Sequence, residues 1–537
     1  MLRDTQLARL ADESFDVLVV GAGINGAVSA AALAGRGSRV ALVDRGDFAG
    51  VTSQASSNLA WGGFKYLESG EIGLVRGLCR SRNRLMAAYP SSVREVRHLT
   101  LIERGFRWHP FLLYIGALIY WLIGGAYTRR PRYVSIDKLR DEEPIVDTGK
   151  GWGGMEHSES QLVDNDARFV FRFVRSALDD GGACASYVEA TGAERDGDGW
   201  RVSLRDVISG RTWTTRCKVL VNACGPYADG FNARIGHTTQ HRHVLSKGVH
   251  LVFPQLTKHR RVLAMFTDDG RPFFALAMAD RTMIGTTDTE IDTGQGEVDD
   301  ADRRYLLDNL NKRLALPQPL TEADIVAERV GVRPLAIDKS QQIAEVDWLK
   351  LSRKHVVELD EAARLVTIFG GKLTDCINVG DEVAAAVMRA GVAVPTIDHR
   401  WFGEPGPAEK RSFDRQARAL GLDRDDDGAG ASTAARIWRR HGRHAFAILD
   451  RIRRDPRAAE RLIEHPPYTR AEVEQMASGD MIVRLDDFLR RRTELAMVTP
   501  EAELARSPGV WAACRVLFGE AAEARWRERF ETDPPVA

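Results

Sequence analysis

The sequence lacks the cysteine patterns of disulfide-rich and zinc-binding proteins. Only six of its 537 residues are cysteines, and no two of them form a C-x-x-C pair. This spacing argues against a zinc site or a redox dithiol, so we expect no metal site. It also gives no sign of a disulfide framework, which predicts a reducing compartment. The six residues are Cys79, Cys184, Cys217, Cys224, Cys376 and Cys514.

The sequence also lacks an excess of either charge. Its 75 basic and 75 acidic residues cancel. No global basic field therefore indicates a nucleic-acid partner, and we expect none. The first 16 residues carry charges throughout and lack the apolar core of a secretory signal. These features predict a cytoplasmic protein.

No apolar run reaches the ~20 residues that an α-helix needs to cross a bilayer. The most apolar window, residues 111–125, is 15 residues long and has arginines on both sides. Three interpretations stay open: a buried helix, a helix lying in a membrane surface, or part of a pocket wall. The basic rim suits peripheral attachment to the inner face of the cell membrane, which we expect. The flanking arginines are Arg104, Arg107, Arg129, Arg130 and Arg132.

The chain is too long for one hydrophobic core, so we expect two or three domains. Residues 14–45 follow the order strand, glycine turn, helix and strand, and a helix pattern fills residues 166–178. Residues 249–287 carry four short strand patterns that are typical of an antiparallel sheet. From about Arg400 onward the pattern is helical and rich in arginine and alanine, which predicts a separate helical domain.

The strongest motif is DVLVVGAGINGAVSAAALAGRGSRVALVDR, residues 16–45. An apolar strand runs into Gly21, Gly23 and Gly26, a helix of small residues follows, and a second strand ends at Asp44. In such a turn the first glycine makes the bend and the second lets a pyrophosphate approach the backbone. The third lets helix and strand pack closely, and the acidic residue accepts a hydrogen bond from a ribose hydroxyl. The motif predicts a dinucleotide site without separating NAD from FAD.

The residues that follow favour FAD, because a polar, glycine-rich segment, residues 47–71, comes directly after the motif. Together with later motifs, this segment resembles the FAD-dependent glycerol-3-phosphate dehydrogenase family, within the D-amino-acid-oxidase-like flavoproteins. The resemblance spans residue 15 to about residue 389. The motifs that carry it are VVGAGING, TSQASSNLAWGGFKYLE, VDNDAR, VNACGPYAD, KGVHLVFP, IGTTD, GVRPL and FGGKLT.

The resemblance implies an α/β fold with three parts. These are a glutathione-reductase-type Rossmann domain that binds FAD, an antiparallel-sheet substrate or cap domain, and a C-terminal helical domain. We expect the FAD and substrate core at residues 14–395 and the helical domain at residues 400–537. Within the core, the expected FAD-binding parts are about 14–70, 155–235 and 325–395, and the substrate or cap parts about 71–154 and 236–324.

The resemblance also implies which residues hold FAD, which we expect to be noncovalent. The glycine turn would hold the pyrophosphate, and Asp44 would hold the adenosine ribose. A helix N-terminus beyond Gly371 would stabilise the negative charge of reduced flavin. The expected cofactor residues are Gly21, Gly23, Asn25, Gly26, Asp44, Arg45, Thr52, Ser53, Ser56, Ser57, Ala223, Gly225, Gly371, Lys372, Leu373 and Thr374.

The implied reaction is the oxidation of sn-glycerol 3-phosphate to dihydroxyacetone phosphate, with hydride transfer to FAD and electrons passed to a quinone or similar acceptor. It needs a base, and it needs cations that hold a phosphate. By resemblance, His250 is the base or orienting donor and Arg333 lies near the substrate oxygen. Arg353, Lys65 and Lys372 are the further candidate cations. Arg353 could instead be a solvated surface charge, and His250 a hydrogen-bonded core histidine.

Departures from the family pattern keep the substrate open. Trp61 and Lys65 stand where many members have histidine and arginine, and Asp375 begins a stretch that differs from the usual Thr-Tyr-Arg. Asp375 should weaken anion binding if its side chain points into the site. Another phosphorylated polyol, a hydroxy or amino acid, and a non-catalytic flavin-binding redox sensor stay open as alternatives. A homodimer stays open as well.

Overall fold

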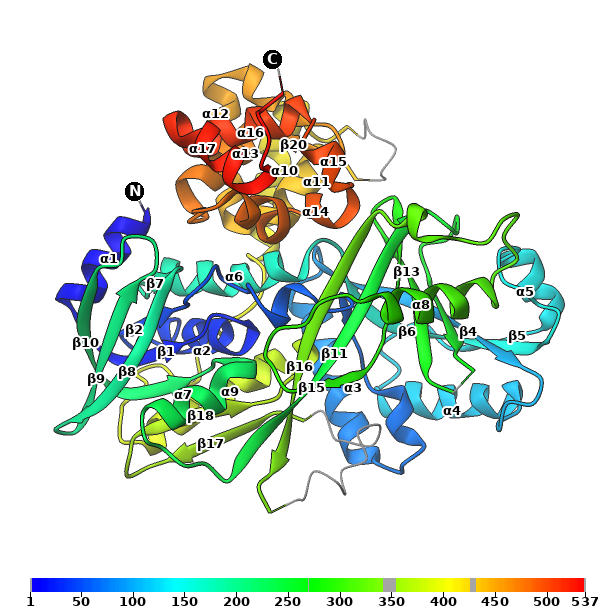
Figure 1. The fold of residues 1–537 in the computed structure, drawn as a ribbon, viewed down its shortest axis with the longest axis horizontal. Helices are drawn as coiled ribbons and strands as arrows, with labels where there is room; N and C mark the ends of the chain where they lie inside the picture. Colours follow the sequence, from blue (N-terminus) through cyan, green and yellow to red (C-terminus); the bar gives the residue numbers. More distant parts are fainter. Residues whose placement is uncertain (1, 269, 341–353, 425–430, 536–537) are drawn as a thin grey trace.

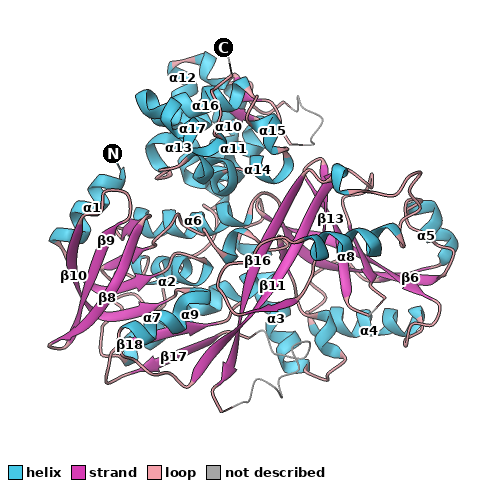
Figure 2. Cartoon of the chain, viewed as in Figure 1, coloured by secondary structure: helices cyan, strands magenta, loops and turns pink. Residues whose placement is uncertain are grey.

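The computed structural model describes residues 2–268, 270–340, 354–424 and 431–535, which form three parts (Figure 1). One sheet with helices packed on it carries the N-terminus, and a second sheet lies beside it. Helices of the C-terminal region form the third part, at the top of the view (Figure 2). This architecture confirms the predicted fold class, an α/β FAD-binding fold with a substrate sheet and a C-terminal helical domain.

The first sheet is a Rossmann-type sheet around β1 (Ser14–Val20), whose apolar run DVLVV is buried on both faces. Its other strands are β2 (Val40–Val43), β7 (Ala183–Ala185), β8 (Val188–Asp196), β9 (Gly199–Asp206), β10 (Thr212–Asn222), β17 (Val356–Asp360) and β18 (Leu365–Phe369). The strand order is β17-β18-β10-β1-β2-β7. The pairs from β18 to β7 are parallel, and β17 and the β8-β9 hairpin are antiparallel additions.

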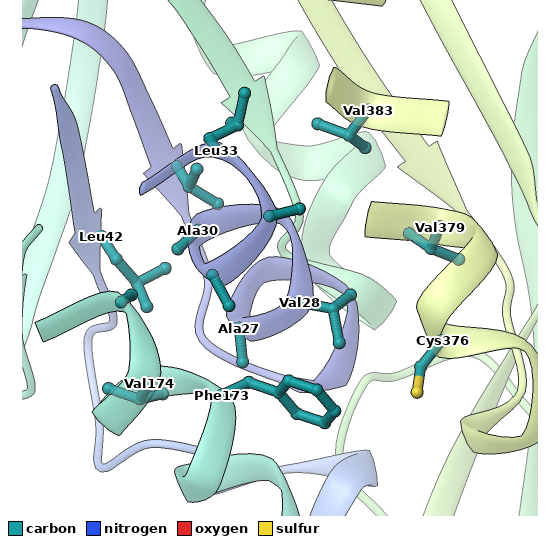
Figure 3. Close-up of a cluster of buried hydrophobic side chains, with 14 of the residues drawn as sticks. Ala27, Val28, Ala30, Leu33, Leu42, Phe173, Val174, Cys376, Val379 and Val383 are labelled. Atoms are coloured by element: carbon teal, nitrogen blue, oxygen red, sulfur yellow. The ribbon is translucent and has the colours of Figure 1, made fainter. Parts of the chain in front are cut away.

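The helices of this part are α1 (Leu2–Asp12), α2 (Ile24–Ala34), α6 (Asp166–Asp179), α7 (Ala228–Arg234) and α9 (Cys376–Arg389). Small residues such as Ala27 and Ala30 let α2 lie close to α6 and α9 in one buried cluster (Figure 3). Cys376 belongs to that cluster, and its burial raises the pKa of the thiol. A protonated, buried thiol is a poor nucleophile, which favours the expected noncovalent FAD.

We predicted an antiparallel second sheet, but the sheet is mixed. Its strands are β3 (Leu59–Ala60), β4 (Val93–Glu103), β5 (Arg132–Val134), β6 (Gly151–Leu162), β11 (His241–Pro254), β12 (Val262–Phe266), β13 (Pro272–Met278), β14 (Arg281–Gly285), β15 (Thr289–Ile291) and β16 (Ala327–Asp338). β12 pairs with β4 in parallel, whereas the other pairs are antiparallel. Strands so far apart in sequence leave no local signal of their pairing.

The second sheet also contains residues from both sides of the boundaries that we expected between the FAD-binding and the substrate or cap parts of the core. β6 pairs with β4, and β16 pairs with β11 along twelve residues. Residues 151–162 and 327–338 therefore belong to the second sheet, although most of them fall in segments expected to bind FAD. The outer boundaries, 14–395 and 400–537, stay a prediction.

Helix α4 (Pro110–Ile123) lies on the outside of the second part, together with α3 (Ile72–Ala88), α5 (Ile136–Glu142) and α8 (Asp300–Asn311). Its outer face is apolar and open to solvent: Phe111 is 52% exposed, Ile119 49% and Leu122 64%. This exposure excludes a fully buried helix for residues 111–125. Within the described ranges, no helix is both long and apolar enough to cross a membrane.

The C-terminal part has two small hydrophobic cores, one around Trp438 and one around Trp526. A π-helical turn, Asp487–Arg492, faces the first sheet and its loops. The helices are α10 (Pro407–Ala419), α11 (Thr433–His441), α12 (Ala445–Arg454), α13 (Arg470–Gly479), α14 (Leu495–Val498), α15 (Glu501–Leu504), α16 (Pro508–Phe518) and α17 (Ala522–Phe530), with the short strands β19 (Arg461–Ile463) and β20 (Tyr468–Thr469).

Gly26→Ala should destabilise the protein, because a Cβ at Gly26 would lie 1.8 Å from the carbonyl oxygen of Gly21. Overpacking of this kind costs ~1–3 kcal/mol or more. The matched control is Gly77→Ala in α3, where a Cβ meets nothing within 4 Å. That change should stabilise an exposed helix by up to ~1 kcal/mol. Thermal unfolding of the two variants checks the difference, and a Gly26→Ala protein as stable as the control would contradict it.

Candidate active site

A cavity between the two sheets gathers many of the predicted site residues. Its volume is about 280 Å³, near the lower end of the ~300–1,000 Å³ that small-ligand pockets measure. The predicted residues that line it are Thr52, Ser53, Ser56, Ser57, His250, Arg333, Gly371, Lys372, Leu373 and Thr374.

The glycine turn has the geometry that its motif predicts. Gly21 has a φ of +97°, and a Cβ there would lie 2.5 Å from the carbonyl oxygen of Ala223. Gly26 packs directly on the Gly21 carbonyl. A Cβ on Gly23 would meet only the hydroxyl of Ser53, at 3.2 Å. The fold itself therefore requires the first and third glycines, whereas the second faces space that a ligand can use.

Asp44 lies at the end of β2, beside this turn. Its carboxylate accepts hydrogen bonds from the backbone N–H groups of Ala22, at 2.7 Å, and Gly46, at 2.9 Å. Burial raises the pKa of Asp44 to about 6. A carboxylate has about four acceptor positions, so two remain for hydroxyl donors. Ala223 and Gly225 follow the end of β10 on the other side of the turn.

Two further residues of the expected cofactor set contact other parts of the protein. The guanidinium of Arg45 lies 4.0 Å above the ring of Tyr227. Asn25 donates a hydrogen bond to the carbonyl of Gly370, at 2.9 Å, and its buried Oδ1 has no hydrogen-bond partner among the described residues. Asn25 thus ties the glycine turn to the turn that precedes α9.

The segment after β2 closes over the N-terminus of α2. The hydroxyl of Ser53 accepts a hydrogen bond from the backbone N–H of Ile24, at 2.9 Å, and its own proton stays available for an anion. Thr52 donates to a backbone carbonyl of β16, at 2.6 Å. The backbone N–H of Ser56 donates to Asp166 at the start of α6, at 2.8 Å. Hydroxyl groups and a helix N-terminus therefore face the same space.

Sequence reasoning missed Arg329, which fixes this segment from the second sheet. Arg329 and Asp166 form an ion pair at 3.0 Å, and both side chains are fully buried. The guanidinium also donates to the carbonyl of Gln54, at 2.9 Å. Arg329 lies opposite His250 in the β11-β16 register. The motif VDNDAR contained Asp166 but gave no signal of its partner.

The turn before α9 forms another wall of the cavity. Gly371 has a φ of +119°, which favours glycine. Thr374 accepts a hydrogen bond from the backbone N–H of Trp61, at 2.9 Å. The ammonium of Lys372 lies 3.1 Å from the hydroxyl of Tyr66. This turn therefore joins the polar segment of residues 47–71 to the N-terminus of a helix.

His250 is buried in the middle of β11, with 4% of its surface exposed. A Cβ at Gly285 on β14 would lie 2.3 Å from the imidazole, so the ring needs a glycine opposite it. Burial, and then the charges of Arg329 and Arg333, lower the pKa of His250 well below its usual range. The imidazole is therefore neutral near pH 7 and has a nitrogen lone pair that can accept a hydrogen bond.

Arg333 is held in one orientation at the same wall. It donates hydrogen bonds to the hydroxyl of Thr286, at 2.7 Å, and to the carbonyl of Thr287, at 3.3 Å. It also forms an ion pair with Asp288 at 3.2 Å. A Cβ at Gly248 would lie 2.0 Å from the guanidinium, so this orientation requires glycine there.

Two predicted cations, Arg353 and Lys65, are not found in the described lining of the cavity. Two further lining residues, Lys354 and His98, were not predicted from the sequence. Arg353 lies outside the described residues, whereas its neighbour Lys354 lines the cavity. Lys65 does not belong to the described lining, and its ammonium lies 5.2 Å from the ring centre of Tyr66. His98 of β4 lines the cavity too, and burial lowers its pKa to about 3. The only sequence signal that could have identified His98 as a lining residue is its position in a β-strand.

We expected Asp375 to weaken anion binding if its side chain points into the site. Asp375 does not belong to the described lining of the cavity, so this weakening is not expected. Its carboxylate accepts hydrogen bonds from Ser81, at 2.7 Å, and Asn378, at 2.6 Å, and lies 2.9 Å from the imidazole of buried His355. Although burial opposes it, Asp375 and Glu382 raise the pKa of His355 to about 9. Protonated His355 therefore neutralises the carboxylate of Asp375 outside the described lining of the cavity.

Comparison with known proteins gives two family matches on this chain. Residues 16–372 match the FAD dependent oxidoreductase family, and residues 406–525 match the C-terminal domain of alpha-glycerophosphate oxidase. Glycerol-3-phosphate dehydrogenase 2 of Mycobacterium tuberculosis is 30% identical over 505 residues, covering 92% of this chain and 83% of that protein. Human mitochondrial glycerol-3-phosphate dehydrogenase is 28% identical over 527 residues, covering 93% and 70%.

Solved structures agree on the fold. Glycerol-3-phosphate dehydrogenase from Bacillus halodurans, complexed with FAD, matches with a TM-score of 0.74 and 23% identity, covering 99% of this chain and 97% of that chain. L-alpha-Glycerophosphate oxidase from Mycoplasma pneumoniae, with FAD bound, matches with a TM-score of 0.54 and 16% identity, covering 73% and 97%.

The sheet order and the glycine turn define a class, the Rossmann-type dinucleotide-binding proteins, and the family match confirms FAD as the cofactor. The chain belongs to the FAD dependent oxidoreductase family. Within it, the chain is a glycerol-3-phosphate dehydrogenase-like oxidoreductase, with 30% identity across 92% of its length.

The pair of His355 and Asp375 should make stability depend on pH. The pKa of His355 is about 9 when folded, against ~6.5 when unfolded. Its contribution is therefore fully present below pH ~6.5 and is lost as the pH rises through about 9. Replacing His355 by glutamine should flatten the fall in apparent melting temperature across this range. His444→Gln, at a half-exposed histidine, is the control. Equal slopes in wild type and His355→Gln would contradict the assignment.

Proposed function

We propose that this protein oxidises sn-glycerol 3-phosphate to dihydroxyacetone phosphate and passes the electrons to a quinone. The observation that carries the proposal is a neutral, buried histidine, His250, beside a fixed arginine, Arg333, in the cavity that the glycine turn also approaches. FAD, when bound, supplies the hydride acceptor. The identity to a curated glycerol-3-phosphate dehydrogenase supports this choice of substrate.

The residues present fit FAD as an extended ligand. We assign the pyrophosphate to the space beside Gly23 and the α2 N-terminus, where the Ser53 hydroxyl can donate to it. Asp44 would accept from the ribose, because two of its acceptor positions remain. The isoalloxazine would lie against Gly371 to Thr374, ahead of the α9 N-terminus, which favours negative charge on the ring.

His250 would take the hydroxyl proton of the substrate. Removal of a hydride from the carbinol carbon leaves this proton, which needs an acceptor close by. The lowered pKa keeps His250 unprotonated at neutral pH. The charges of Arg329 and Arg333 also disfavour a charged ring. His250 would therefore pass the proton on to solvent water at the open side of the cavity.

The substrate phosphate would bind among Arg333, Lys354 and Lys372, which line one cavity. Asp288 neutralises part of the charge of Arg333, so the two lysines are needed to balance a phosphate dianion. Lys65 would contribute less, because it does not belong to the described lining of the cavity. We retain Arg353 as a further phosphate contact on the resemblance alone.

A hydroxy or amino acid is the second candidate substrate. The positive charge of Arg333 in the cavity wall can attract a carboxylate. Such a substrate would depend less on Lys354 and Lys372, which distinguishes it from a phosphorylated polyol.

The outer face of α4 supports a membrane contact and hence a membrane-dissolved quinone as acceptor. Its exposed residues form an apolar face on the second part of the molecule. On the inner side, Tyr120 donates to buried Glu159, which accepts from the backbone N–H of Gly62, at 2.8 Å. Gly62 directly follows Trp61 in the cavity wall. Only a few contacts thus separate the apolar face from the site.

Anaerobic reduction of the bound flavin tests the substrate. Glycerol 3-phosphate should bleach the flavin faster than carboxylated alcohols or amino acids do. Arg333→Ala should lower kcat/KM about tenfold to a hundredfold, because a charged hydrogen bond contributes ~1.5–3 kcal/mol. His250→Ala should slow reduction at saturating substrate by ~10²–10⁴, with a smaller effect on KM.

The control is Arg303→Gln on α8, which removes ion pairs outside the described lining of the cavity. It should leave reduction unchanged. If Arg333→Ala reduced flavin with glycerol 3-phosphate as fast and as tightly as wild type, the phosphate assignment would be wrong. Faster bleaching by a hydroxy or amino acid would favour the second candidate.

Ile119→Glu and Leu122→Glu should weaken sedimentation with anionic vesicles while leaving the flavin bound, because both side chains are exposed on α4. Ile208→Glu is the control, since Ile208 is 40% exposed on a different part of the surface. Salt should release the protein only in part, because the flanking Arg107, Arg129 and Arg132 already pair with carboxylates. Equal vesicle binding by wild type and the α4 variants would exclude this surface.

A further inference from the structure

Three consecutive arginines of the C-terminal part reach into the loop that follows β2. They are Arg490, Arg491 and Arg492, at the end of the π-helical turn Asp487–Arg492. Their targets lie in residues 47–57, more than 400 positions earlier in the chain. The same segment carries the serines that we assign to the FAD pyrophosphate.

Asp47 is the centre of this contact. Its carboxylate accepts from Arg491, at 2.6 Å, and from both terminal nitrogens of Arg492, at 2.9 and 2.8 Å. The side chains of Asp47 and Arg492 are fully buried. The guanidinium of Arg492 also lies 4.2 Å above the ring of Phe171 on α6. A buried carboxylate with three such donors holds its loop in one position.

Gln54 is the second point of contact. Its side-chain oxygen accepts from Arg491, at 3.2 Å, and its backbone carbonyl accepts from Arg490, at 3.4 Å. The same carbonyl accepts from Arg329 of β16. The loop is therefore held at residue 47 by the C-terminal part and at residue 54 by both the C-terminal part and the second sheet.

Ser53 lies between these two points and hydrogen-bonds to the N-terminus of α2. Within the same loop, the backbone N–H of Ala49 donates to the carbonyl of Ala22, at 2.9 Å, directly after Gly21. Movement of Asp47 or Gln54 would therefore displace the loop from the glycine turn. Arg491 and Arg492 do not line the cavity among its described residues, so they act on it through the loop.

We propose that Arg491 and Arg492 are positioning residues for FAD. They hold residues 47–57 closed over the pyrophosphate space, so that docking of the C-terminal part sets how tightly the enzyme retains its cofactor. This inference rests on the proposed path of FAD along the glycine turn. It gives the C-terminal part a role in cofactor binding without any contact to FAD.

The test measures the dissociation constant of FAD by recovery of flavin fluorescence on dilution of the full-length enzyme. Arg492→Gln should weaken FAD binding about tenfold or more, because a charged hydrogen-bond pair to Asp47 is lost. Arg492→Lys should restore part of the affinity, since it keeps the charge but not the fork. The flavin absorption bands of the variant should broaden as the loop admits water.

Arg529→Gln is the matched control. Arg529 pairs with Asp486, which lies one residue before the turn begins, and with Glu501. All three residues belong to the C-terminal part. Its loss should destabilise that part without altering FAD affinity. An equal loss of FAD from Arg529→Gln would show that general stability, and not positioning, is responsible. Unchanged FAD affinity in a folded Arg492→Gln protein would overturn the proposal.

Two further variants keep the test decisive. If Arg492→Gln does not fold, Arg491→Gln replaces it, because that side chain is partly exposed at 11%. In a double-mutant cycle, Asp47→Asn should add little to the effect of Arg492→Gln, and full additivity would contradict the contact. Gly23→Val tests the FAD path separately: retention of FAD there would refute the path, whatever the arginine variants do.

Discussion

The buried ion pair of Arg329 and Asp166 joins the parts that make up the site. Arg329 belongs to the second sheet, Asp166 begins a helix of the first part, and the cofactor loop hydrogen-bonds to both at Gln54 and Ser56. Neither charge is exposed, and loss of one partner would leave the other unpaired in a medium of low dielectric. Because Arg329 is opposite His250 in the strand register, this one contact also fixes the His250 side of the cavity relative to the glycine turn.

Charge in the site is arranged so that positive groups face the cavity and negative groups lie behind it. Arg333, Lys354 and Lys372 line the cavity, whereas Asp288 and Asp375 contact cations from the side or from behind. Burial, and then the charges of Arg329 and Arg333, lower the pKa of His250 and keep it neutral. A neutral histidine and several cations can therefore lie at one cavity, because burial penalises a charged imidazole more than it does a paired guanidinium.

The three parts of the molecule also differ in how they use their surfaces. The C-terminal part directs Arg491 and Arg492 onto Asp47, and Arg168 of α6 reaches Asp480 of the C-terminal part, so ion pairs join the two parts. Helix α4 does the opposite and leaves Phe111 and Leu122 exposed. Charged hydrogen bonds require one geometry, which suits the positioning of a cofactor loop. An apolar face can pack on any apolar surface, which suits the proposed membrane contact.

The sequence by itself determined the Rossmann motif, the FAD class and ten of the residues that line the cavity, including His250 and Arg333. These depend on local rules: a positive φ at Gly21, a short β-strand pattern, and motifs a few residues long. Only the tertiary structure decided the parallel pairing of β12 with β4, the partner of Asp375, and the entry of Arg492 into the cofactor loop. Each joins segments far apart in the chain, and pairwise contact at such separation is set by packing of the whole fold, which no local pattern encodes.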